Sequence, residues 1–206
     1  MKKMYKLFGA LLVLLFIASS SFAQQEQVKI RPIRLGVKVG TPNIGSINVE
    51  LLSSIFNHKL AIAGDYGVYS QPFTDASVSG TYDFSYWAAE VHLYLRKPGK
   101  GAYLGLGYGH LNIAVNADGY TSAAYLGQTG SGTGEVGGSF KMIKLGAKWG
   151  GLIYFRPEIG YSFVDFDDVI KIKVKYATNT IEQNEKMPPV NDYFKLVFNL
   201  GIGIAF

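Results

Sequence analysis

Hydrophobic and polar residues alternate along most of the chain, and the alternation is clearest in residues 194–206. There every even position is large and apolar, whereas the odd positions are polar or small. A period of two indicates a β-strand with one apolar face, because successive side chains of a strand point to opposite sides. The segment is also long enough for a strand that crosses a membrane.

Seven further segments alternate in the same way. They cover residues 33–40, 47–56, 59–69, 82–96, 102–115, 139–149 and 152–163. The alternation loses its phase near residues 86–87 and 110–111, which predicts bulges or strand ends at these places. Pro157 lies on the apolar face of the seventh segment, and a proline is typical of an edge or a bulge, so the register there stays open.

Short and long connections between these segments alternate too. Tight turns are expected at 57–58, 97–100 and 150–151, and long links at 71–81, 116–137 and 164–191, with 41–46 as a short link in a long position. An up-and-down barrel with an even number of strands places all connections of one kind on one rim. We therefore predict an all-β fold, an eight-stranded antiparallel up-and-down transmembrane β-barrel over residues 33–206.

Residues 1–23 predict a cleaved signal peptide. Lys2, Lys3 and Lys6 precede an apolar stretch that is too short for a spanning helix, and small residues follow it up to Ala23. We expect residues 24–32 to form a short periplasmic segment, with both ends of the mature chain in the periplasm. The sequence has no cysteine, which excludes disulfides and thiol chemistry.

The net charge of the chain gives no reason to expect a nucleic-acid partner. The formal charge is +5, and the predicted signal peptide carries three lysines and no acidic residue, so 5 − 3 = +2 remains after cleavage. Twenty-five glycines, fourteen tyrosines and thirteen phenylalanines favour many strands over helices.

Alternation alone allows two kinds of barrel. One is a membrane barrel with its apolar face outside, and the other is a soluble, lipocalin-like barrel that binds a hydrophobic ligand inside. Small residues and charges of both signs on the second face favour the membrane barrel, as do aromatic residues near the strand ends, among them Tyr66, Tyr108, Trp149, Phe163, Phe194 and Phe206. The predicted polar network of the lumen consists of Arg34, Lys38, Glu50, Asp65, Glu90, His92, Arg96, Lys144, Lys148, Arg156, Glu158 and Lys195.

From Ile33 to Phe206 the pattern resembles the small outer-membrane barrels of the OmpA and OmpX type from Gram-negative bacteria, most specifically at the carboxyl end. In those proteins the last strand carries a polar residue, a glycine two positions on, and then hydrophobic and aromatic residues that end in Phe. Asn199, Gly201, Ile204 and Phe206 match these places. The resemblance implies that the barrel-assembly machinery reads them, although Phe206 also suits a plain interface anchor.

The chain shows no motif that points to catalysis, a metal or a cofactor. His92 is expected to be a hydrogen-bonded member of the lumen network, and His110 has no serine nearby in the sequence, which a lipid A-modifying barrel enzyme would need. Lys171, Lys173 and Lys175 alternate with apolar residues and predict a hairpin that turns near Thr178 and Asn179. Its lysines suit either the phosphates of lipopolysaccharide or the protection of an edge strand.

These observations favour a non-enzymatic, monomeric barrel in the bacterial outer membrane, with a lumen filled by side chains. Its expected role is in envelope integrity or in surface contacts through the outer loops, with outer-membrane lipid and lipopolysaccharide as partners. The alternatives are a narrow channel that favours anions, a lipid A-modifying enzyme, and a soluble binder of a hydrophobic ligand.

Overall fold

The computed structural model describes residues 30–75, 78–121, 129–166, 169–176, 180–186 and 194–206, and within them it is all-β. The strands are β1 (Ile33–Thr41), β2 (Ile44–Leu52), β3 (Leu60–Asp75), β4 (Val78–Tyr94), β5 (Gly101–Thr121), β6 (Thr129–Gly150), β7 (Ile153–Phe166), β8 (Val169–Lys175), β9 (Thr180–Lys186) and β10 (Leu196–Ala205). The predicted signal peptide and the predicted turn at residues 178–179 lie outside the described residues. No helix within them is long and apolar enough to cross a membrane.

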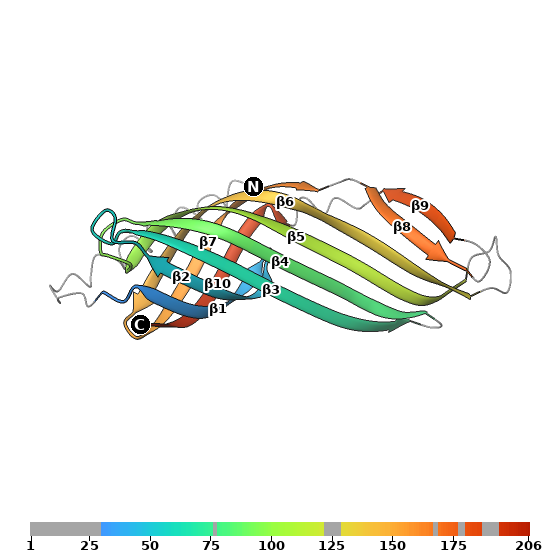
Figure 1. Cartoon of the computed structure of the whole chain (residues 1–206), viewed down its shortest axis with the longest axis horizontal. Coiled ribbons are helices and arrows are strands. Elements are labelled where there is room, and N and C mark those ends of the chain that lie inside the picture. The colour runs from blue at the N-terminus through green and yellow to red at the C-terminus, as the bar shows by residue number, and fades with distance from the viewer. Residues whose placement is uncertain (1–29, 76–77, 122–128, 167–168, 177–179, 187–193) are drawn as a thin grey trace, which may run out of the picture.

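Eight of the strands form a closed antiparallel ring (Figure 1). β1 to β7 follow one another around it, β10 pairs with β7, and β1 pairs with β10 to close it. The closing ladder runs from Arg34–Ala205 to Thr41–Phe198. The predicted all-β, antiparallel, up-and-down topology with eight ring strands is therefore confirmed. The hairpin of β8 and β9 stands outside the ring and pairs with the far part of β6.

The ring strands differ greatly in length. β1, β2 and β10 have 9, 9 and 10 residues, whereas β3 to β6 have 16, 17, 21 and 22. The far ends of the long strands project to one side of the ring, together with β8 and β9 (Figure 1). We call this projecting sheet the extension. The long links predicted at 71–81 and 116–137 are therefore wrong, because most of these residues continue the strands into the extension.

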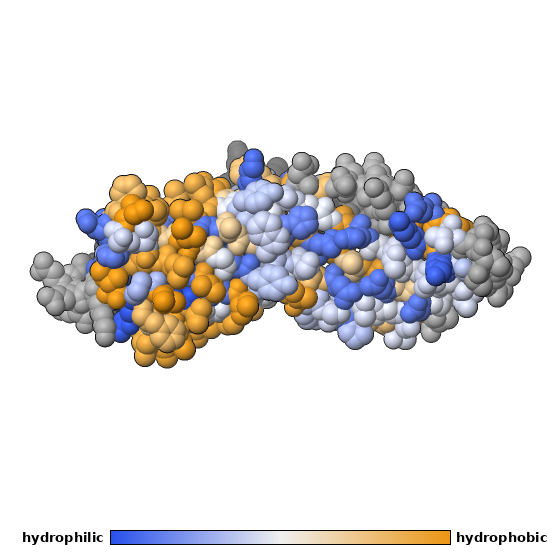
Figure 2. Space-filling model, viewed as in Figure 1, coloured by the Kyte–Doolittle hydropathy of each residue, from blue (hydrophilic) through white to orange (hydrophobic). Residues whose placement is uncertain are grey.

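The apolar faces of the ring strands point outward, as predicted. Val37, Phe155 and Ile202 are paired neighbours on the outer surface and are 51%, 44% and 55% exposed. Figure 2 shows apolar side chains gathered over the half of the molecule that holds β1, β2 and β10, and mainly polar ones over the extension. This apolar band, the belt, is about as tall as β1, β2 and β10, whose length suits a tilted strand across a bilayer.

In the extension the two faces exchange their polarity. Along β4 the inward residues change from Glu90 and His92 to Tyr86 and Phe84, while the outward residues change from Val91 to Ser85. The same happens on β5, where Leu111 lies inward and Asn112 outward. The pairing of β4 with β3 and β5 is continuous across this level. The bulges or strand ends predicted near residues 86–87 and 110–111 are therefore wrong. The apolar residues move from the outer to the inner face there, whereas the backbone pairing continues without a shift in register.

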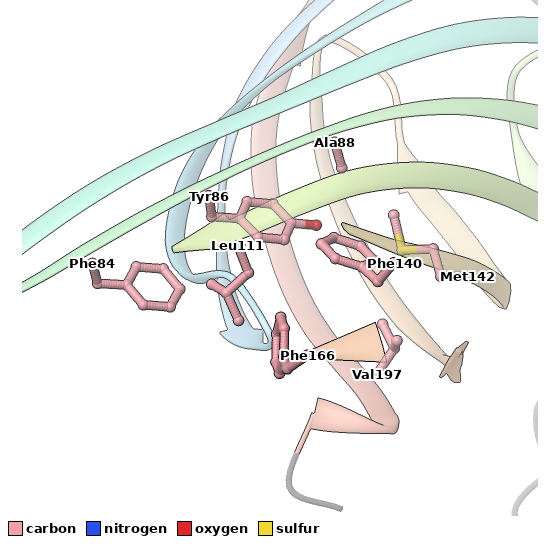
Figure 3. Close-up of a cluster of buried hydrophobic side chains, with 8 residues drawn as sticks. All are labelled: Phe84, Tyr86, Ala88, Leu111, Phe140, Met142, Phe166 and Val197. Carbon is pink, nitrogen blue, oxygen red and sulfur yellow. The ribbon is translucent and has the colours of Figure 1, made fainter. Parts of the chain in front are cut away.

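A cluster of buried apolar side chains lies on the inner face at the level of this exchange (Figure 3). Its members come from β4, β5, β6, β7 and β10 and are Phe84, Tyr86, Ala88, Leu111, Phe140, Met142, Phe166 and Val197. Phe194 packs against it, with its ring centroid 5.7 Å from that of Phe166. The prediction that Phe194 lies on the outer apolar face is therefore wrong.

The predicted tight turns lie on the rim opposite the extension. Asn57 and His58 adopt positive φ angles of 54° and 59°, and Gly99 one of 56° in the turn between β4 and β5. Gly99 is also buried against the guanidinium of Arg34, so a Cβ at this position would meet both a strained backbone and a clash. At Pro157 the ladder to β10 is kept, but the ladder between β6 and β7 omits the pairs opposite Arg156 and Pro157.

Gly36 on β1 and Gly203 on β10 are paired at the seam between these strands, and both lie against Tyr154. A Cβ on Gly203 would lie 2.3 Å from the carbonyl oxygen of Leu35 and 2.5 Å from Oη of Tyr154, whereas a Cβ on Gly45 would meet nothing within 4 Å. Gly203→Ala is therefore expected to destabilise the barrel by about 1–3 kcal/mol, and Gly45→Ala to change it little. The measurement is denaturant unfolding of both variants in detergent, with folded and boiled samples compared on a gel. Equal stability of the two variants would contradict a tight seam.

Candidate functional site

The lumen holds a network of buried ion pairs, and Glu50 on β2 is its first centre. Its carboxylate pairs with Arg34 on β1, with Nη1 of Arg156 on β7 at 2.8 Å and with Nζ of Lys148 on β6 at 3.3 Å. The hydroxyl of Tyr94 donates to the same carboxylate at 2.9 Å. One acidic residue on β2 therefore joins side chains from four other strands of the ring.

The second centre consists of three carboxylates around two lysines. Nζ of Lys144 lies 2.5 Å from Glu90 and 2.8 Å from Glu158, and Nζ of Lys38 lies 2.6 Å from Asp65 and 3.4 Å from Glu158. Each lysine thus contacts carboxylates of at least two other strands. A buried charge needs such partners, because the desolvation of an unpaired one costs several kcal/mol.

His92 on β4 connects the two centres. Its Nδ1 lies 2.9 Å from Glu50 and its Nε2 lies 2.6 Å from Glu90. His92 therefore links the two carboxylates, one through each ring nitrogen.

The network fills the lumen at this level. The side chains of Glu50, Glu90, Glu158 and His92 are 0% exposed, and that of Arg156 is 1% exposed. No water-sized space therefore adjoins these side chains. Tyr94 and Tyr103 pack beside them with ring centroids 5.1 Å apart, and the apolar cluster of Figure 3 lies directly above.

The structure gathers ten of the predicted lumen residues in this network. They are Arg34, Lys38, Glu50, Asp65, Glu90, His92, Lys144, Lys148, Arg156 and Glu158, all of them buried. Arg96 does not join them: it follows the end of β4 and is exposed beside the turn at 97–100. Lys195 was predicted from the alternation to face the lumen, but it precedes β10 and is half-buried rather than buried.

The four residues of the predicted assembly signal occupy both faces of β10. Asn199 is buried and donates from Nδ2 to Glu158 at 3.3 Å, and Gly201 leaves room for the stem of Lys38. Ile204 and Phe206 lie on the outer surface, 46% and 57% exposed. The inward half of the signal therefore also packs the ion network.

Several network members escaped the sequence analysis because they are uncharged. Tyr94 donates to Glu50, Tyr103 donates to Glu158, and Asn48 donates to Asp65. Their inward phase on β4, β5 and β2 was the available signal. Charge alone selected the predicted set, whereas the buried carboxylates also need neutral donors.

One carboxylate and histidine group has the spacing of a metal site. The candidate ligand atoms of Glu90, His92 and Glu158 lie within 4.8 Å of one another. Nζ of Lys144 already bridges the two carboxylates at 2.5 and 2.8 Å, and Nε2 of His92 lies 2.6 Å from Glu90. The arrangement therefore suits an internal ammonium better than a divalent cation.

The outer surface holds a second polar group, just above the belt. His110 on β5 and Ser139 on β6 are paired across the ladder, with Nδ1 3.4 Å from Oγ. The sequence near His110 holds no serine, and the ladder between β5 and β6 supplies Ser139 from the adjacent strand instead. Among the described residues, no carboxylate is recorded on Nε2 of His110.

Polar side chains continue across the outer face of the extension. Asn112 donates to Glu135 at 2.8 Å, and Asn116 donates to Asp83 at 2.9 Å. Hydrogen bonds from Ser70, Thr81 and Asn116 lower the pKa of the exposed Asp83 carboxyl, so it stays ionised at neutral pH. These ladders give the extension a hydrophilic outer surface.

No family model matches the chain, and no curated protein matches it. Among solved structures, CarO of Acinetobacter baumannii is similar in fold at 10% sequence identity and a TM-score of 0.41. The match covers 88% of this chain and 99% of CarO.

Loss of the Glu50 charge is expected to destabilise the barrel strongly. Glu50→Gln keeps the shape but leaves Arg34, Arg156 and Lys148 without their shared counter-charge, which should cost about 3–5 kcal/mol. The matched control is Glu182→Gln, which breaks the exposed 2.9 Å pair with Lys173 and should cost at most about 1 kcal/mol. Unfolding midpoints in urea compare the two, and similar small effects would mean that Glu50 is not a centre of the network.

Proposed function

We propose that the protein is a non-enzymatic barrel of the bacterial outer membrane with a closed lumen, which contributes to envelope integrity or to surface contacts through the extension. The observation that carries this proposal is the fully buried ion network, which fills the ring at the level of Glu50 and Glu90. An eight-stranded ring is just wide enough for its own side chains, and here they are paired.

The placement in a membrane is supported by the outward belt. A continuous outer surface of Ile, Leu, Val and Phe side chains is too large for a soluble monomer and matches the surface that lipid covers. The ring form leaves no free strand edge at the level of the belt, as lipid requires. The soluble, lipocalin-like alternative needs an apolar interior, whereas this lumen is charged at the same level.

We place the tight turns and both ends of the mature chain in the periplasm and the extension outside the cell. Asn199, Gly201, Ile204 and Phe206 would be read by the barrel-assembly machinery before β10 closes onto β1. Outer-membrane lipid and lipopolysaccharide would surround the belt of a monomer.

Conductance measurements test the closed lumen. Protein refolded into planar bilayers, and shown to be folded by its gel mobility before boiling, is expected to give no discrete ion steps. The lumen network has five basic side chains (Arg34, Lys38, Lys144, Lys148 and Arg156) and four acidic ones (Glu50, Asp65, Glu90 and Glu158). Steady openings with a preference for anions would therefore replace this proposal with the narrow channel.

A lysine on the belt tests the membrane placement. Ile202→Lys should destabilise the protein in lipid by about 2–4 kcal/mol, because residue 202 lies on the outer face in the middle part of β10. Ser79→Lys, on the exposed outer face of the extension, is the control and should cost little. Equal stability of the two variants in lipid vesicles would argue against a bilayer around the belt.

A second candidate, a lipid-modifying hydrolase, is favoured only by the contact between His110 and Ser139. A serine nucleophile needs a base within hydrogen-bond reach and a group that orients that base. We expect the wild type to hydrolyse acyl esters no faster than Ser139→Ala does. A difference of tenfold or more between them would assign catalysis to this pair.

A further inference from the structure

The outer face of the extension contains a groove of about 450 Å³. Its walls come from three strands, with His110, Asn112 and Asn116 on β5, Thr133 and Glu135 on β6, and Lys173 on β8. The strand pairings Asn116–Thr133 and Thr133–Lys173 place these residues in one row across the sheet. The groove therefore lies on one continuous sheet and not in a gap between separate elements, and Ala114 and Val136 line it beside the polar residues.

The groove begins where the belt ends. Trp87 is the strand partner of His110, and its ring lies 6.0 Å from that of Tyr108 in an edge-to-face arrangement. Both rings are on the outer surface, 43% and 47% exposed, and the residues below them, such as Val91 and Leu106, are apolar. If the proposed function holds, on which this inference rests, the groove faces the headgroup layer of the outer leaflet.

The groove offers hydrogen-bond donors and acceptors in fixed positions. Asn112 and Asn116 each use an amide N–H on a neighbouring carboxylate, which orients the amide and leaves its oxygen for a ligand. The carboxylates of Glu135 and Asp83 would repel an anion centred here, but they accept well from hydroxyl groups. A ligand rich in hydroxyls fits this set, and the Trp87 and Tyr108 rings suit the C–H face of a sugar ring.

Ammonium groups lie at both ends of the polar surface. Lys173 lines the groove from β8, and its ammonium also pairs with the exposed Glu182 at 2.9 Å. Lys141 stands beside Tyr108 on the next strand, exposed at the level of the aromatic rings. Lysines are common partners of phosphate. We propose that the groove binds the phosphorylated sugar headgroup of lipopolysaccharide, with the sugar hydroxyls over Glu135 and Asn112 and the phosphates at the lysines.

The test is binding of lipopolysaccharide to the full-length protein in detergent, followed by native mass spectrometry. Lys173→Ala and Glu135→Ala should each lower the affinity at least about fivefold. The matched controls are Lys175→Ala, which removes the same charge from the same strand, and Asp118→Ala, which removes an exposed carboxylate of the same sheet; neither lines the groove. Both controls should stay within about twofold of the wild type.

Two results would overturn the inference. Equal losses in Lys173→Ala and Lys175→Ala would mean that lipopolysaccharide is held by overall charge. A gain in affinity for Glu135→Ala would mean simple attraction of an anion, because that variant removes a negative charge but also a sugar-binding group.

Further arms identify the source of the ligand. Phosphatidylethanolamine should bind at least about tenfold more weakly than lipopolysaccharide, and inorganic phosphate should not compete; either failure overturns the sugar-headgroup assignment. Each preparation is also checked for the mobility shift on boiling. A folded barrel from the membrane fraction that binds without using the groove refutes this inference alone, whereas protein found in the soluble periplasmic fraction refutes the proposed function as well.

Discussion

The structure depends on the pairing of buried charges inside a closed ring. Five basic and four acidic side chains, with His92 between them, are all buried inside it. None of these charges is stable there alone, so the position of each strand is tied to the positions of its neighbours. Glu50 shows this most clearly, because its partners come from β1, β4, β6 and β7.

The alternation of residues predicted the ring well and the extension poorly. In the ring, lipid-facing and lumen-facing positions differ sharply in residue type, so Val37 beside Lys38 or Val91 beside Glu90 indicates the sides directly. In the extension the difference reverses, and a reversal looks like a bulge when only the sequence is read. Stretches such as 129–138 are rich in Gly, Ser and Thr, a composition that predicts a loop, although their backbone pairs with both β5 and β8.

The candidate sites show the same limit. Charged lumen residues could be selected from their inward phase, but Arg96 lies past the end of β4 and cannot reach the lumen. The contact between His110 and Ser139 joins residues 29 positions apart in the sequence, and the groove beside it brings together residues of β5, β6 and β8. Such contacts follow from the register between strands, which a single sequence does not specify.

The pairing of β1 with β10 has a kinetic consequence. Ring closure brings together residues as distant as Arg34 and Ala205, so the slowest contact to form joins nearly the two ends of the described chain. Arg34 and Lys38 can meet Glu50 and Asp65 early, through the neighbouring strands β2 and β3. Arg156 on β7 reaches Glu50 on β2 only across the closed ring, so this ion pair forms after β10 has paired with β1. Ring closure and the pairing of the last buried charges therefore occur in the same step. A partly closed barrel keeps unpaired charges, which favours its closure electrostatically.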